Sequence, residues 1–363
     1  MKCWRGYLIA AIIAACTWAL HGFFSAHSVL IDMIYPYVTR MAQSFLADWS
    51  SGVNFCVWQM LLVSTIALTV TSAVLMIILK WNPIRWGGWI CTVVAVVVFL
   101  NTCLYGLNQY SGPLSEDVRL EETDYTITEL EEAAVYYRNQ ANALANQVMR
   151  DSSENVLYGT FEELADQAVN GFETLVYEQS LSVFAGSMQP VKKLGWANRY
   201  TAKGVTGVTA GLTGEAAVNP ETPPVLLPFA MCREMARRAS IVVERDASFA
   251  AYLACMANED IQFQYTGALL AYRYCLMALQ ELDLVTGAGV ADRVAAEANA
   301  NVTYDVAVCD GFYGDQQTAD ADACGLLVSW HIQNVVLPAL LEEEKTFDPM
   351  DKTQVDLSDH PNA

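Results

Sequence analysis

Histidine is scarce in this chain of 363 residues, which contains four, two of them within the first 27 positions. That scarcity argues against most enzymes that work by acid–base catalysis. The ten cysteines include no C-x-x-C pair, which excludes zinc ribbons, iron–sulfur sites and thioredoxin-like chemistry. The sequence also lacks a glycine-rich phosphate loop, a G-x-S-x-G elbow and a Ser–His or Cys–His arrangement. These absences remove most of the common enzyme classes.

Basic residues are also few: 20 Lys and Arg stand against 40 Asp and Glu, a net charge of −20. Residues 1–108 contain five basic and two acidic residues, a net of +3, so residues 109–363 carry −23. Such an acidic region repels a phosphate backbone, which excludes nucleic acid as a partner. The apolar content of 54% is high for a wholly soluble protein and predicts that part of the chain lies in a membrane.

Three apolar runs without any Asp, Glu, Lys or Arg are long enough to span a bilayer, at about 7–26, 56–79 and 86–107. They define a membrane domain at 1–108. Lys2 and Arg5 precede the first run, and Lys80 and Arg85 fill the link between the other two. The positive-inside rule then predicts a cytoplasmic amino terminus and an extracytoplasmic location for everything after residue 108.

The segment 27–55, between the first two runs, has apolar residues at helical spacing, with aromatic side chains that suit the headgroup region. It is predicted to lie on the outer membrane surface. The start of the chain allows a second interpretation, since Ile13-Ala14-Ala15-Cys16 resembles a lipoprotein cleavage site. The apolar run continues ten residues past Cys16, which favours an uncleaved span.

The outer part divides into an acidic linker at 109–125, a helical domain at 126–343 and a polar, acidic tail at 344–363 that is predicted to be disordered. Capping boxes at Thr126 or Thr128 and at Thr160 predict where two amphipathic helices begin. Residues 186–225 are rich in Gly, Thr and Pro and predict short strands or extended loops. Pro338 is expected to kink or end the last helix. The predicted fold is therefore mostly α, with a short β or extended segment.

The central stretch LLPFAMCREMARR contains Arg233-Glu234-Met235-Ala236-Arg237, which has the frame of an H-E-x-x-H motif. In that motif two histidines four residues apart bind zinc from one helix face, and the glutamate is the general base. A guanidinium has no acceptor lone pair and stays protonated, so neither Arg233 nor Arg237 can bind a cation.

The segments LTGEAAVNPE, LLPFAMCREMARR, ERDASFAAYLAC and GALLAYRYCLMAL, which follow the apolar runs in order, resemble a bacterial membrane-protein family, domain of unknown function 3810. Better-preserved members read approximately TGEANVN, LPFxxCHExAHQxG and REDEANFxAYLAC. The resemblance covers most of residues 30–285. It implies a zincin-like, gluzincin-type fold in a bacterial plasma membrane, with zinc and peptidase activity in relatives that keep both histidines.

Carried over residue by residue, the two histidine positions fall on Arg233 and Arg237, and the general base falls on Glu234. The third metal ligand falls on Asp246, and Glu244 is a second candidate for it. Glu215 lies where the family has the same residue, as a possible accessory residue to which we assign no chemistry. The resemblance thus predicts a degenerate metal site without zinc or another cofactor.

The two arginines supply the same +2 charge as a zinc ion, and we expect them to pair with Glu234 and Asp246 in one cavity. Such a site is either satisfied internally or leaves an arginine fork for a carboxylate of a peptide or protein partner. The simplest alternative is a solvated helix face on which Glu234 pairs with Arg238. The leading hypothesis is an inactive metallopeptidase homologue with a binding, regulatory or scaffolding role. An active zinc metallopeptidase with an unconventional site and a purely structural membrane protein are the alternatives.

Cys309 and Cys324 bracket a polar loop and are the pair that we predict to form a disulfide outside the cell. The Asp-rich loop from Asp310 to Asp322 could instead hold calcium, but it lacks EF-hand spacing.

Overall fold

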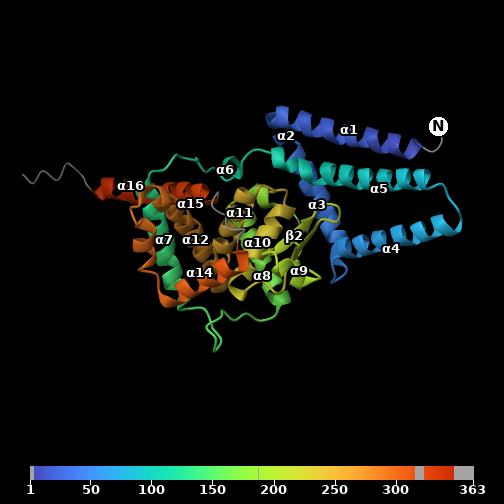
Figure 1. The fold of residues 1–363 in the computed structure, drawn as a ribbon. Helices are drawn as coiled ribbons and strands as arrows, with labels where there is room; N and C mark the ends of the chain where they lie inside the picture. Colours follow the sequence, from blue (N-terminus) through green and yellow to red (C-terminus); the bar gives the residue numbers. More distant parts are fainter. Residues whose placement is uncertain (1–3, 187, 315–322, 347–363) are drawn as a thin grey trace, which may run out of the picture.

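The computed structural model describes residues 4–186, 188–314 and 323–346. Three helices project side by side from one end of the molecule: α1 (Arg5–Ala26), α4 (Val57–Ile78) and α5 (Pro83–Leu104) (Figure 1). Their bounds match the three predicted spans closely. Helix α1 packs directly on α5 where Gly6 meets Gly88, and the Thr92 hydroxyl donates to the Gly6 carbonyl at 2.8 Å. Small residues permit this approach, as is common between membrane helices.

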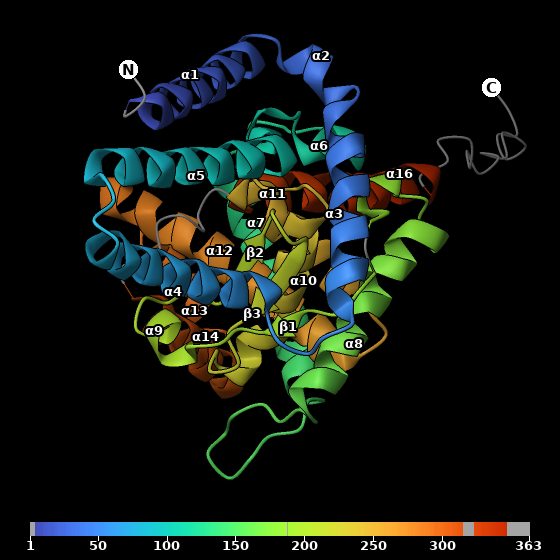
Figure 2. The same ribbon diagram turned by 90° about the vertical axis from the view of Figure 1, so that its right-hand side faces the viewer.

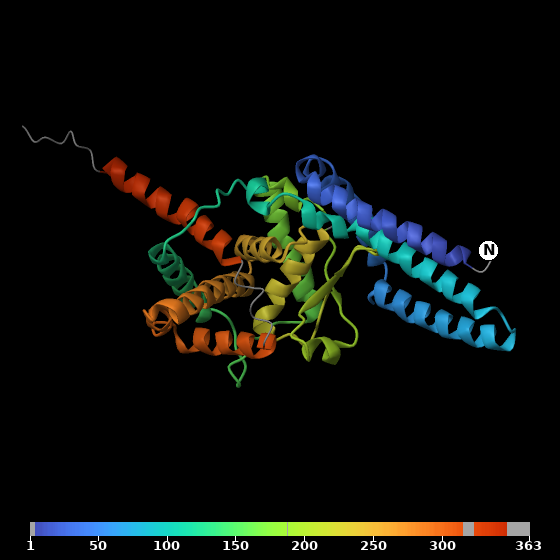
Figure 3. The ribbon, with the colours of Figure 1, turned by 45° about the horizontal axis from the view of Figure 1, so that its top comes forward.

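Four helical segments in the described residues are long and apolar enough to cross a membrane, one more than predicted. The fourth, Ala323–Leu341, has a third of its most apolar stretch buried within the protein. It contains α15 (Ala323–His331), the π-helical segment η6 (Ile332–Val336) and the start of α16 (Leu337–Thr346). Helix α15 belongs to the core of the helical domain, and α16 points away from the three projecting helices (Figure 3). Length and hydropathy alone cannot separate such a core helix from a span.

Pro338 does not end the last helix, which continues to Thr346. The chain changes from α to π geometry just before it, and the Leu337 N–H donates to the Ile332 carbonyl. This shift of the hydrogen-bond pattern accommodates a residue without an N–H. Residues 344–346, assigned to the disordered tail from the sequence, are part of α16. The rest of that predicted tail lies outside the described residues.

Helices α2 (Ser28–Asp32) and α3 (Tyr35–Ser51) lie between the projecting helices and the helical domain, and α3 crosses the direction of the projecting helices (Figure 2). One face of α3 is buried, and the Thr39 and Gln43 side chains lie on it. The opposite face exposes Met41, Phe45 and Trp49, each about 70% accessible. Helix α3 is therefore amphipathic, as predicted for 27–55.

The helical domain has one large core, formed mainly by α7, α8, α10, α11, α12 and α15. Capping boxes at Thr126 and Thr160 start α7 and α8, which confirms these two predictions. The helices after the membrane region are α6 (Leu114–Asp117), α7 (Ile127–Ala145), α8 (Phe161–Glu173), α9 (Ala197–Thr201), α10 (Leu227–Arg238), α11 (Glu244–Ala257), α12 (Ile261–Thr286), α13 (Val290–Ala295) and α14 (Ala300–Tyr313). Short 3-10 or π turns are η1 (Gly106–Tyr110), η2 (Thr174–Glu178), η3 (Ser182–Phe184) and η4 (Pro224–Leu226).

A small sheet lies within 186–225, as the Gly, Thr and Pro content predicts. Its order is β1 (Lys192–Lys193), β3 (Glu215–Val218), β2 (Gly207–Ala210), with β1 parallel and β2 antiparallel to β3. Helix α10 packs against β2 and β3. The sheet thereby places side chains from β2 and from the residue that precedes it against the face of α10 that carries the arginines.

Candidate functional site

Helix α10 carries the degenerate motif through the middle of the domain. The helix follows η4 directly, and Pro228 lies in its first turn, where a missing N–H costs nothing. Glu234 is completely buried, and Arg233 is 6% exposed. Arg238 is 3% exposed, and a guanidinium nitrogen donates to the Gln189 carbonyl. The alternative of a solvated face with a Glu234–Arg238 pair is therefore wrong.

Both carboxylate oxygens of Glu234 accept strong hydrogen bonds. Arg237 Nη1 donates to Oε1 at 2.8 Å, and the Thr209 hydroxyl on β2 donates to Oε2 at 2.8 Å. A Cβ on Gly207 would lie 2.5 Å from Glu234 Cγ, so only glycine permits this approach of the strand. The general-base position of the motif is thus enclosed and occupied by partners from its own chain.

Glu244, in the first turn of α11, is the second carboxylate of the site. Arg233 Nη1 donates to Glu244 Oε1 at 3.0 Å, and Arg237 pairs with Glu244 Oε2. Arg233 Nη2 also donates to the Thr206 hydroxyl at 2.5 Å. We call Arg233, Glu234, Arg237 and Glu244 the arginine cluster. Its two positive and two negative charges alternate and cancel, which is how buried charges are made tolerable.

Asp246 does not join the arginine cluster, contrary to the expected pairing with the two arginines. One of its oxygens accepts the Leu114 N–H at 3.3 Å, and the other pairs with Arg245 Nε at 3.3 Å. Residues two positions apart in a helix point about 200° apart. Because Glu244 faces the arginines, Asp246 must face the other side of α11. The second candidate, Glu244, therefore takes the position beside Arg233 and Arg237.

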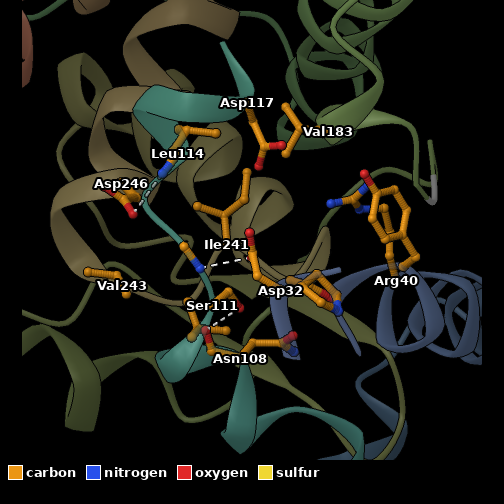
Figure 4. Close-up of a pocket in the computed structure, with 15 residues that line it drawn as sticks. Asp32, Arg40, Asn108, Ser111, Leu114, Asp117, Val183, Ile241, Val243 and Asp246 are labelled. Atoms are coloured by element: carbon orange, nitrogen blue, oxygen red, sulfur yellow. Dashed lines mark hydrogen bonds between the residues drawn. The ribbon is translucent and has the colours of Figure 1, made fainter. Parts of the chain in front are cut away.

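Asp246 instead lines a cavity of about 70 Å³ between α2, α3, α6 and α11 (Figure 4). Asp32 and Asp117 face the same cavity, together with Arg40. Burial raises the pKa of Asp246, and the Leu114 N–H and the positive charge of Arg245 oppose that rise. The cavity lies where the projecting helices join the helical domain.

The raised pKa of Asp246 predicts how the free energy of unfolding depends on pH. A carboxyl whose pKa in the folded protein lies above its usual 3.8 binds more protons folded than unfolded, so the free energy of unfolding falls as pH rises through that interval. Asp246→Asn should therefore raise the thermal midpoint at pH 7 and leave it unchanged at pH 3, since the amide oxygen can still accept the Leu114 N–H. Asp166→Asn, at an exposed position of α8, is the control. A midpoint at pH 7 that falls in Asp246→Asn would contradict the assignment.

Glu215 has a defined position although no chemistry was assigned to it. Its buried carboxylate accepts from the backbone N–H groups of Val57 and Trp58 at 2.8 Å each. It also accepts from Lys192 Nζ at 2.7 Å and from the Thr213 hydroxyl at 2.8 Å. Val57 is the first residue of α4, so Glu215 caps a predicted membrane span from within the sheet. The residue joins β3 to α4 and lies outside the arginine cluster.

Helix α3 joins the C-terminal end of α10 to the projecting helices. Arg40 Nε donates to the Ala239 carbonyl at 3.2 Å, and the hydroxyls of Thr39 and Ser240 lie 3.1 Å apart. Gln43 Nε2 donates to the Leu104 carbonyl at the end of α5 at 3.0 Å. These contacts fix the helix that carries the motif relative to the predicted spans.

Cys324 is a free, buried thiol whose sulfur lies 3.7 Å from that of Cys275. The predicted bridge from Cys324 to Cys309 is therefore absent from the structure, because α15 packs Cys324 against α12, which carries Cys275. The Asp-rich loop considered for calcium lies largely in 315–322, outside the described residues.

The residues of the motif do not fit a metal ion. Guanidinium groups, which have no lone pair to donate, stand at the two positions where an H-E-x-x-H motif would have histidine. Both oxygens of Glu234 and both oxygens of Glu244 are already engaged by Arg or Thr side chains. Across the described residues, no three His, Cys, Asp or Glu side chains gather in a way that could hold a metal.

Comparison with known proteins gives one match, to a protein-family model. No curated protein and no solved structure matches the chain. A protein-family model described as "Protein of unknown function (DUF3810)" matches residues 31–322, from α2 to the start of α15. This match covers well over half of the chain and confirms the resemblance found from the sequence motifs. The chain therefore belongs to the DUF3810 family.

Proposed function

We propose that this chain is a membrane-anchored, catalytically inactive relative of zincin-like peptidases, with a binding, regulatory or scaffolding role. The observation that carries the proposal is the arginine cluster, in which two guanidinium groups hold the two carboxylates that a metal centre would otherwise use. A general base must reach a water, whereas Glu234 is completely buried and its two oxygens accept hydrogen bonds from Arg237 and Thr209.

The same geometry favours an internally satisfied site over a free arginine fork. One oxygen of Glu244 accepts a hydrogen bond from Arg233 and the other accepts one from Arg237. One oxygen of Glu234 accepts a hydrogen bond from Arg237. A carboxylate ligand from a peptide would have to displace Glu244, whose side chain is 33% exposed, from two ion pairs. We therefore assign the cluster to the stability of the α10–α11 junction and place any partner contact elsewhere on the domain.

The arrangement of charge supports the proposed topology of three spans with the helical domain outside the cell. The basic residues Arg5, Lys80 and Arg85 lie at the far end of the projecting helices, away from the domain (Figure 1). Helix α3, whose exposed face carries Met41, Phe45 and Trp49, crosses the direction of these helices (Figure 2), as expected of a helix that lies in the outer headgroup region. Protease added to intact cells should cut the helical domain; complete protection would contradict this orientation.

Metal analysis of the purified full-length protein tests the function. After expression in zinc-supplemented medium, the protein should contain far less than one zinc per chain, because neither arginine position can donate a lone pair. The protein should also show no peptide hydrolysis, with or without a chelator. Stoichiometric zinc that disappears on Glu234→Ala would refute the proposal and favour the active peptidase. A lowered melting temperature of Arg237→Ala without any change in metal content would support a structural cluster.

A further inference from the structure

A groove of about 530 Å³ separates the ends of α4 and α5 that lie farthest from the helical domain. Apart from their connecting link, the two helices are joined there by a hydrogen bond of 3.2 Å from Trp86 Nε1 to the Ser72 hydroxyl. Helix α1 packs along the length of α5 and does not line the groove. The residues that line it include Ser72 on α4 and Trp81, Asn82, Arg85, Trp86 and Trp89 on the link and α5.

The groove must be filled once the helices are in a bilayer. Its volume is many times the ~30 Å³ that one water molecule occupies in the liquid, and most of its lining is apolar. Water gains too few hydrogen bonds on such a surface to be retained there. An acyl chain fits this apolar space between two membrane helices.

The mouth of the groove is suited to an anionic headgroup. Among the described residues, the Arg85 guanidinium takes part in no hydrogen bond or ion pair, and no acidic residue occurs between Asp48 and Glu116 in the chain. Trp81 and Trp89 are about half exposed beside it, in the position that tryptophan takes at a membrane–water boundary. Basic residues among membrane helices at this boundary attract anionic lipid headgroups.

The geometry points to a binding site for one anionic phospholipid, with its phosphate at Arg85 and an acyl chain in the groove between α4 and α5. This inference rests on membrane insertion of α4 and α5 and is independent of the arginine cluster. The cluster could bind zinc or a peptide without affecting it, so the two proposals fail separately. Lys80, on the same link, does not line the groove and provides a matched control.

Native mass spectrometry of the full-length protein, equilibrated with equal amounts of phosphatidylglycerol and phosphatidylcholine of identical acyl chains, tests the site. One retained lipid per chain is expected, with roughly a fivefold preference for phosphatidylglycerol. Arg85→Gln should reduce the preference to less than about twofold, whereas Lys80→Gln should keep it. Ile90 on α5 also lines the groove, so Ile90→Trp should fill it and reduce retention of both lipids.

Three results would overturn the assignment. Equal preference in Arg85→Gln and the native chain would show that Arg85 holds no headgroup. Displacement of the lipid by millimolar inorganic phosphate alone would make the groove a small-anion site. A lipid-free dimer that dissociates in Ile90→Trp would show that a second copy fills the groove. Unchanged melting temperatures of the variants establish that each is folded.

Discussion

Glu215→Gln is expected to lower the free energy of unfolding by about 3–5 kcal/mol, the cost of breaking a buried ion pair by removing one partner. The carboxylate is fully enclosed and is paired with Lys192, whose side chain is 12% exposed. Its loss leaves that ammonium group without a counterion. The amide nitrogen of glutamine would also face one of the N–H groups of Val57 or Trp58, which both donate to the native side chain.

The neighbouring residue in β1 supplies the control for Glu215. Lys193 pairs with Glu162 at 2.7 Å, but these side chains are 47% and 66% exposed. An exposed pair contributes about 0–1 kcal/mol, so Glu162→Gln should change the unfolding free energy by no more than that. Denaturant unfolding of the two variants in the same detergent measures the difference. Equal effects would mean that Glu215 does not anchor α4 to the sheet.

The contacts of Glu215 illustrate which features the sequence can predict. The long apolar helices near 7–26, 56–79 and 86–107 and the capping boxes at Thr126 and Thr160 depend on residues close together in the chain, and all of them form in the structure, with a fourth apolar helix that was not predicted as a span. The cap on α4 joins residues 158 positions apart, and no local pattern signals it. The glutamate in TGEAAVN lies where the family it resembles has the same residue, but this likeness does not indicate a partner at the start of α4.

The arginine cluster also shows that local spacing predicts which residues of one helix lie together but not which residue of a neighbouring helix contacts them. The motif frame correctly places Arg233, Glu234 and Arg237 together, because i, i+3 and i+4 share a helix face. The choice between Glu244 and Asp246 depends on how α11 is rotated, and this rotation is set by packing against α10 and α12. Likewise, the partner of Cys324 is determined by the docking of α15 on α12 and not by the spacing of cysteines.

Replacing both arginines by histidine, as Arg233→His with Arg237→His, is expected to create zinc binding, which we propose that the native chain lacks. Without zinc, the double variant should be less stable than the native protein, because Glu234 and Glu244 lose their counterions. Zinc restores +2 charge to the same place, and two imidazoles four residues apart project from one face of α10. At a free zinc concentration about 1,000 times the Kd, binding should raise the unfolding free energy by about 4 kcal/mol.

The third ligand in that variant distinguishes the two acidic residues of α11. Glu244 lies beside both replaced positions, whereas Asp246 faces the cavity on the other side of the helix. Adding Glu244→Ala to the double variant should therefore weaken zinc binding by at least about tenfold. This is the effect of losing a metal ligand or a residue that orients one by a hydrogen bond. Adding Asp246→Ala should leave zinc binding unchanged. The reverse result would place Asp246, and not Glu244, beside the two introduced histidines and contradict the arrangement of the arginine cluster. Because a single arginine left in place keeps one positive charge among the ligands, each single variant should bind zinc far more weakly than the double variant.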